Sequence, residues 1–258
     1  MRGITLAVDA ATSAASVAVF QDGTLLAEAT LDTRNRDEER LMPAIAETLA
    51  RAAAAPGQVT RVVCGSGPGS FTSLRIAAAI AKGLSLSLGA ELWVASSLAL
   101  VVAGSDATRQ PGRYLACLDA MRGEWYVRLF HVDGGGMLRA AGDGYRLPRA
   151  SLEQECRRLG AVLVGAGLGP GDDTGVGPGD DTGVDTGVDF GVGRAMRPGV
   201  DLDVFLDAAP HARGIARLTA GDLLVLVDRT AWEPDYGRLA EAQVKWEALH
   251  GRALESEG

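Results

Sequence analysis

Residues 59–89 read VTRVVCGSGPGSFTSLRIAAAIAKGLSLSLG. The β-branched run at 59–64 predicts a short buried strand, and the alanine-rich segment from about Ser70 to Leu88 predicts a helix that Gly89 ends. A glycine-rich turn joins the two. Its residues leave two interpretations open: an anion site made by backbone N–H groups and the helix N-terminus, or a tight turn in which Ser70 is the N-cap.

Strands and helices are predicted to alternate on both sides of this unit. Before it, residues 4–31 predict a three-stranded meander with an Asp22-Gly23 hairpin turn, and residues 35–54 predict an amphipathic helix with Pro43 in its first turn or at a kink. After it come predicted strands at 93–94, 114–119, 124–131 and 161–164, and predicted helices starting at 96–98 and spanning 151–160 and 239–254. This order indicates an α/β protein.

The composition is that of a globular protein, with 47% hydrophobic and 22% charged residues. Much of the net charge of −8 comes from segment 169–192, in which GPGDDTGV occurs twice in tandem and aspartate and glycine dominate. We expect this segment to be a solvated loop and the rest of the chain to be nearly neutral, which argues against tight, direct binding of tRNA. No signal peptide or long apolar run is present, and the three cysteines are widely spaced, so we expect a cytoplasmic protein with reduced thiols and no membrane contact.

Several common catalytic motifs do not occur. The three histidines are far apart and lack the spacing of a helical zinc site, so no metal site is predicted. Neither a P-loop nor a dinucleotide fingerprint is present. Asp-Thr-Gly occurs three times within 169–192, but a slipped duplication explains each copy, whereas an aspartic protease needs two such loops held rigidly together. Peptidase chemistry therefore remains a remote alternative.

The run GPGSFTSLRI at 67–76 resembles the GPGSFTGLRIG signature of the TsaB (YeaZ) family, whose members are needed to make threonylcarbamoyladenosine on tRNA. LAVDAAT at 6–12, ERLMP at 39–43 and DAMRGEWY at 119–126 resemble further family motifs in the expected order. The resemblance covers most of the chain outside 169–192. It departs from the family pattern at Ser73, where glycine is usual, at Ala166, which replaces an aspartate, and before Glu39, where the usual histidine is missing.

The resemblance implies the actin/hexokinase/Hsp70-like (ASKHA) fold, with two α/β subdomains that each contain a mixed sheet flanked by helices. The expected division is 1–104, joined by a C-terminal helix at about 236–258, and 105–235, which contains the insert 169–192. In that fold the first loop approaches a nucleotide phosphate. A vestigial phosphate loop is therefore expected at Asp9, Thr12, Gly67, Gly69 and Ser70.

The function implied is that of a non-catalytic partner, because the histidine pair that binds metal in the TsaD-like transferase is missing here. The expected partners are that transferase and a TsaE-like ATPase, with ATP or ADP bound only at the partner complex and no cofactor on the isolated chain. The expected interface is formed by the two helices at 35–54 and 70–88, through Glu39, Arg40, Leu41, Ile45, Ser70, Leu74, Arg75, Ala78 and Ala81.

Three alternatives remain open. The interface residues could belong to a homodimer, which would compete with the partner for the same surface, or to the chain's own core. The chain could also be a free-standing ATPase or phosphotransferase of the same fold that uses Asp9 and the turn at 67–72.

Overall fold

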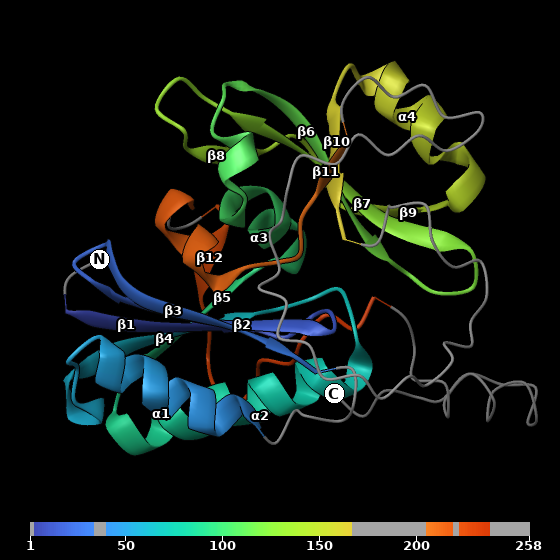
Figure 1. Ribbon diagram of the computed structural model, residues 1–258. Helices are drawn as coiled ribbons and strands as arrows, with labels where there is room; N and C mark the ends of the chain where they lie inside the picture. Colours follow the sequence, from blue (N-terminus) through green and yellow to red (C-terminus); the bar gives the residue numbers. More distant parts are fainter. Residues whose placement is uncertain (1–2, 34–39, 167–204, 219–221, 238–258) are drawn as a thin grey trace, which may run out of the picture.

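The computed structural model describes residues 3–33, 40–166, 205–218 and 222–237, and its strands form two six-stranded sheets (Figure 1). The order in the first sheet is β12-β5-β4-β1-β2-β3, and in the second it is β11-β10-β6-β7-β8, with β9 paired to β7. The first sheet contains β1 (Ile4–Asp9), β2 (Ala14–Gln21), β3 (Thr24–Asp32), β4 (Val59–Gly65), β5 (Glu91–Ala95) and β12 (Leu224–Leu226). The second contains β6 (Gly112–Asp119), β7 (Glu124–Val132), β8 (Leu138–Ala140), β9 (Tyr145–Pro148), β10 (Val162–Gly165) and β11 (Phe205–Asp207).

Both sheets are mixed. In the first, β1, β2 and β3 form an antiparallel meander, while β4 runs parallel to β1 and β5 runs parallel to β4. In the second, β6 and β7 are antiparallel, and β10 runs parallel to β6. The predicted meander and the predicted pair of strands after residue 112 are therefore confirmed.

In the part of the chain that the structure describes, four α-helices complete the layers: α1 (Leu41–Arg51), α2 (Phe71–Leu88), α3 (Ser97–Gly104) and α4 (Leu152–Leu159). Figure 1 shows α1 and α2 side by side along one face of the first sheet and α3 between the two sheets. Short 3-10 helices occur at Pro56–Gln58, Asp106–Thr108, Arg149–Ser151 and Ala212–Arg217.

Side-chain alternation along the strands explains this layering. In β1, Leu6 and Val8 belong to the core under α1 and α2, whereas Ala7 between them faces the core that contains α3. Every residue of α3 is buried, because the helix is enclosed by both sheets. A third apolar cluster joins the other face of the second sheet to Leu152 and Cys156 of α4.

Of the predicted helical span 35–54, residues 35–39 lie outside the described residues, and α1 ends at Arg51 because Ala52 is its C-cap and Ala53 has a positive φ of 51°. Pro43 lies in the first turn, where its missing N–H is not needed. Helix α2 ends at Gly89 with φ of 65°, as predicted. Among the described residues, α2 alone is long and apolar enough for a membrane span. However, Ala77 and Ala81 on its inner side pack in the core of the first sheet, so α2 covers that core.

The predicted insert at 169–192 and the predicted C-terminal helix lie outside the described residues. Strand β12 joins the first sheet by pairing with β5, although the predicted division places residues 224–226 in the second half of the chain. The cause is a long-range pairing that no local pattern signals. The three cysteines are free and buried, and burial raises the pKa of the Cys64 thiol.

Candidate functional site

Asp9 ends β1 and is completely buried. Its Oδ2 accepts a hydrogen bond from the hydroxyl of Ser97 at 2.6 Å, and its Oδ1 accepts one from the backbone N–H of Ala11 at 3.0 Å. The same Ser97 Oγ accepts a hydrogen bond from the backbone N–H of Gly67 at 3.1 Å. Asp9 and Ser97 therefore connect the first loop, the glycine-rich turn and the beginning of α3.

The glycine-rich turn packs directly against the first loop. The backbone N–H of Ser70 donates to the carbonyl oxygen of Ala11 at 2.7 Å, and a Cβ at Gly69 would lie only 2.2 Å from that oxygen. A Cβ at Gly65 would lie 1.8 Å from Asp9 Oδ2. These glycines are needed for close approach of two backbone segments, and two of the N–H groups that could hold an anion already bind the protein. The geometry favours the tight-turn interpretation.

The other residues of the expected phosphate loop are also engaged within the protein. The Thr12 hydroxyl accepts a hydrogen bond from the N–H of Ala14 at 3.2 Å, which closes its own loop. Ser70 occupies the N-cap position of α2, but its Oγ bonds the Oγ of Ser73 at 3.1 Å and makes no capping hydrogen bond to the backbone. The structure thus brings Asp9, Gly67, Gly69 and Ser70 together as predicted and uses them to join loops.

Asp9 also makes folding stability depend on pH. Burial raises its pKa above the ordinary value of 3.8, and this effect outweighs the hydrogen bonds from Ser97 and Ala11, which lower it. The contribution of Asp9 to stability is therefore fully present below the ordinary pKa and is lost as the pH rises through the raised pKa.

We expect the stability of the wild-type protein relative to Asp9→Asn to fall as the pH rises from about 4 to about 8, because Asn cannot ionise. Urea unfolding at several pH values measures the difference between the two proteins. Asp143→Asn, in an exposed loop, is the control. If the stability of the wild type relative to Asp9→Asn stays constant or increases as the pH rises, the pKa of Asp9 is not raised by burial.

The predicted interface residues mostly lie inside the chain. Exposed fractions are 4% or less for Leu41, Ile45, Leu74, Ala78 and Ala81, so these positions belong to the chain's own fold and do not present a contact surface. This corrects their predicted role as close-packing positions of an interface. The physical reason is that α1 and α2 turn these side chains toward the first sheet. Arg40, Ser70 and Arg75 are exposed, and Glu39 lies outside the described residues.

Other residues of α1 and α2 are exposed. Beside charged ones such as Glu47 and Arg75, they include a set of small and apolar residues that we call the outer helix face: Met42, Ala46, Ala50, Ala79, Gly83 and Leu86. Spacings of three and four residues align them along each helix. Leu86 is 71% exposed and Met42 44%. The outer helix face is therefore a surface that two further helices could approach closely.

A segment near the chain end lies along α2 and was not found by sequence reasoning. The amine of Lys82 pairs with Glu233 at 2.7 Å and lies 5.7 Å from the ring centre of Trp232. Farther along the helix, the Arg75 guanidinium lies 4.5 Å from the ring centre of Phe71 and 5.8 Å from that of Tyr236. Residues 229–237, which we call the strap, thus run antiparallel to α2, and two aromatic residues in a polar stretch were the signal available in the sequence.

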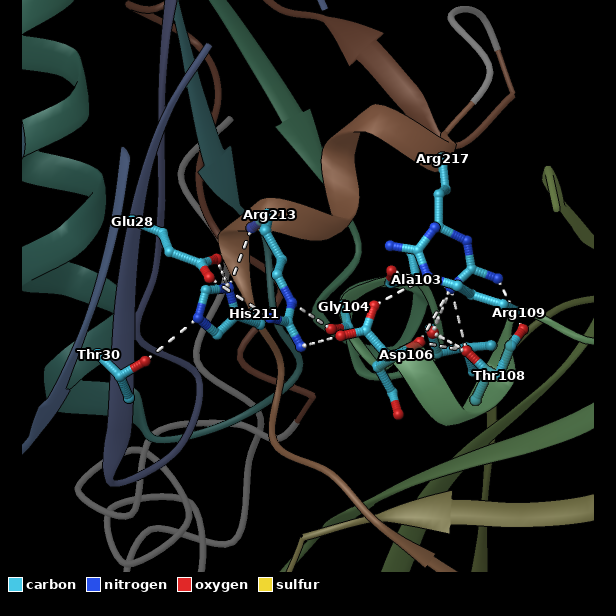
Figure 2. A network of polar contacts seen from close by, with 12 residues as sticks. Glu28, Thr30, Ala103, Gly104, Asp106, Thr108, Arg109, His211, Arg213 and Arg217 are labelled. Carbon is cyan, nitrogen blue, oxygen red and sulfur yellow. Dashed lines mark hydrogen bonds and ion pairs between the residues drawn. The ribbon is translucent and has the colours of Figure 1, made fainter. Parts of the chain in front are cut away.

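Figure 2 shows a second polar network, where β3 meets the segment that leaves β11. His211 Nδ1 accepts a hydrogen bond from the backbone N–H of Arg213 at 3.1 Å, so its proton is on Nε2, which faces Thr30 Oγ1 at 3.2 Å. Burial lowers the pKa of His211, although the Glu28 carboxylate opposes this. Arg213 donates to the carbonyl oxygen of Gly104 at 2.6 Å and lies 3.4 Å from Glu28.

Arg217 forms the other half of this network (Figure 2). Its guanidinium donates to the carbonyl oxygens of Val102 at 3.2 Å, Ala103 at 3.0 Å and Ser105 at 3.2 Å, all at the end of α3. It also donates to the carbonyl oxygen of Thr108 at 2.7 Å. These bonds satisfy carbonyl groups that the C-terminus of a helix leaves without partners. The network therefore holds α3 in place.

The described residues contain no group of three or more His, Cys, Asp or Glu side chains that could hold a metal ion.

A family model described as "TsaD: tRNA N6-adenosine threonylcarbamoyltransferase" matches residues 30–156. The tRNA threonylcarbamoyladenosine biosynthesis protein TsaB of Escherichia coli is 33% identical over 166 residues, which are 64% of this chain and 71% of that protein. The chain belongs to the TsaB family.

Other TsaB relatives agree with this assignment. TsaB of Bacillus subtilis is 30% identical over 130 residues, which are 50% of this chain and 56% of that protein. YeaZ from Pseudomonas aeruginosa superposes with a TM-score of 0.59 at 25% identity and covers 83% of this chain and 89% of that one. A second solved structure, described as an uncharacterized protein with similarity to peptidase YeaZ from P. aeruginosa, gives a TM-score of 0.66 at 26% identity over 92% of this chain and 100% of that one.

These likenesses confirm the expected fold class. The two mixed sheets and the helix between them form an ASKHA-like α/β fold. The match to the TsaD model covers slightly less than half of the chain and is a likeness of fold. Asp9, the glycine-rich turn and α2 are therefore features of a TsaB-family protein.

Proposed function

We propose that this chain is a non-catalytic subunit in the biosynthesis of tRNA threonylcarbamoyladenosine and that it binds and supports a TsaD-like transferase. The observation that carries the non-catalytic role is the closure of the first loop against the glycine-rich turn. Asp9 is fully buried and bonded to Ser97, and Ser70 N–H bonds Ala11, so these groups stabilise the fold. Membership of the TsaB family supports the role in tRNA modification.

The outer helix face is the surface we assign to the partner. It combines small side chains, such as Ala46, Ala79 and Gly83, with the longer Met42 and Leu86. Small residues let helix backbones approach closely, and the longer apolar ones supply buried area on association. A TsaE-like ATPase would join the complex in the cytoplasm, and self-association through the same face would compete with the transferase.

Ala79→Glu is expected to reduce threonylcarbamoyladenosine formation strongly in a reaction reconstituted from the chain, the TsaD-like transferase, the TsaE-like ATPase, threonylcarbamoyl-adenylate and tRNA. A charge buried at the centre of an interface costs on the order of 2 kcal/mol or more, which lowers the affinity about 30-fold. The modified nucleoside is measured by mass spectrometry of digested tRNA at limiting concentrations of the chain.

Ala141→Glu is the matched control, because Ala141 is exposed in a loop of the second half. It should leave the yield at the wild-type level. Equal yields from the Ala79→Glu and wild-type proteins would remove the outer helix face from the proposal. Leu74→Glu is unsuitable, since Leu74 is fully buried and its replacement would test folding.

The alternative function, a free-standing ATPase, has a direct test. Under our proposal the isolated chain gives no micromolar binding of ATP with Mg²⁺ by calorimetry. Tight binding, with hydrolysis that Asp9→Ala abolishes, would favour the ATPase.

A further inference from the structure

A cleft of about 290 Å³ lies between the two halves of the molecule, apart from the outer helix face. Pro68, Ser96 and Leu98 line it from the first half, and Tyr126, Arg128 and Tyr145 line it from the second sheet. Asp235 and Gly237 of the strap close one side. The volume is close to the lower end of the range of clefts that bind small molecules, so the cleft suits a small ligand.

Arg128 is the distinctive residue of this cleft. Its Nε donates to the carbonyl oxygen of Gly142 at 2.9 Å, and the guanidinium lies 5.5 Å from the ring centre of Phe130. These contacts hold the side chain at one end and leave its two terminal amino groups for another partner. Within the described parts of the chain, no carboxylate lies within ion-pair distance of Arg128.

The neighbouring arginines, unlike Arg128, form ion pairs with carboxylates. Arg146, which also lines the cleft, pairs with Glu124 at 3.3 Å. Arg149, at the end of the same sheet, pairs with Asp119 at 2.7 Å. Arg128 is thus a half-buried guanidinium whose positive charge is not balanced by an ion pair among the described residues, in a cleft that Pro68 and Leu98 also line.

We propose that the cleft binds a small molecule through a carboxylate that Arg128 holds, while the apolar part of the ligand rests on Pro68, Leu98 and Tyr126. A planar guanidinium matches a carboxylate or a phosphate with two parallel hydrogen bonds. Asp235, which also lines the cleft, repels a phosphate dianion more strongly than a singly charged carboxylate, and this favours the carboxylate. The recessed position, lined from both halves, favours a small molecule over a protein surface.

The test uses the full-length chain and saturation-transfer NMR titrations at constant ionic strength, with three probes: butyrate, butyramide and inorganic phosphate. Butyrate is expected to bind in the millimolar range, and butyramide, which has the same shape without the charge, is expected not to bind. Arg128→Gln should weaken butyrate binding at least tenfold, and Arg128→Lys should retain part of it. Arg113→Gln, an exposed cation at the start of β6, is the matched control and should bind as the wild type does.

Asp235→Asn provides a second test that does not depend on Arg128. Removal of the opposing charge should tighten butyrate binding severalfold, while Asn keeps an oxygen for the N–H of Gly237, which Asp235 Oδ1 accepts at 2.7 Å. Absence of butyrate binding, binding unchanged in Arg128→Gln, or binding of phosphate alone would each overturn the proposal. Complex formation with the TsaD-like transferase is measured separately, so failure of this inference leaves the proposed function standing.

Discussion

Arg217→Met is expected to lower the free energy of unfolding by about 3–5 kcal/mol, because it leaves several buried carbonyl groups without donors. The guanidinium of Arg217 bonds the carbonyl oxygens of Val102 and Ala103 at the end of α3, and every residue of α3 is buried. Urea unfolding followed by circular dichroism measures the change.

Two further variants show whether the loss of stability in Arg217→Met comes from its hydrogen-bond donors. Arg217→Lys keeps the charge but loses the planar fork of donors, so it should recover only part of the stability. Arg109→Met removes an exposed arginine that pairs with Asp106, and it should change the free energy of unfolding by less than about 1 kcal/mol. A loss below about 1 kcal/mol in Arg217→Met would show that α3 does not depend on this cap.

Gly69→Ala is expected to destabilise the protein by about 3 kcal/mol, since overpacking at a rigid contact forces backbone shifts. The new Cβ would lie 2.2 Å from the carbonyl oxygen of Ala11, so the first loop and the glycine-rich turn must move apart. That movement also breaks the hydrogen bond from Ser70 N–H to Ala11. Thermal and urea unfolding of the variant measure the loss.

Gly83→Ala is the matched control for this substitution. Gly83 is exposed in the middle of α2, and a Cβ there would meet no atom within 4 Å. Alanine should therefore stabilise the protein by about 0.5–1 kcal/mol through its better helix propensity. If Gly69→Ala also stabilises, the two loops are not in the contact described here.

Much of the fold follows from local patterns in the sequence. The Asp22-Gly23 turn between alternating strands predicts the meander correctly, and the glycines at 65–69 mark the turn that begins α2. What local patterns miss is pairing at long range. Strand β12 pairs with β5, although more than a hundred residues separate them. No periodicity within three residues can specify such a partner.

In the candidate site, too, local patterns predict single residues and miss their long-range partners. Asp9 and the turn stand out in the sequence, but their partner Ser97 is 88 residues away from Asp9 and was not identified. His211 and Arg217 were missed because their contacts come from β3 and α3. The two sides of α2 were exchanged in the prediction, since alanine and other apolar residues surround the helix and give its sequence little amphipathic contrast.

The most direct test of the central claim is size-exclusion chromatography with light scattering of the chain mixed with the TsaD-like transferase from the same organism. We expect a one-to-one complex that Ala79→Glu abolishes and Ala141→Glu preserves. Separate elution of the two wild-type proteins at micromolar concentrations, together with ATP turnover by the chain alone, would contradict the partner role and make Asp9 the residue to examine.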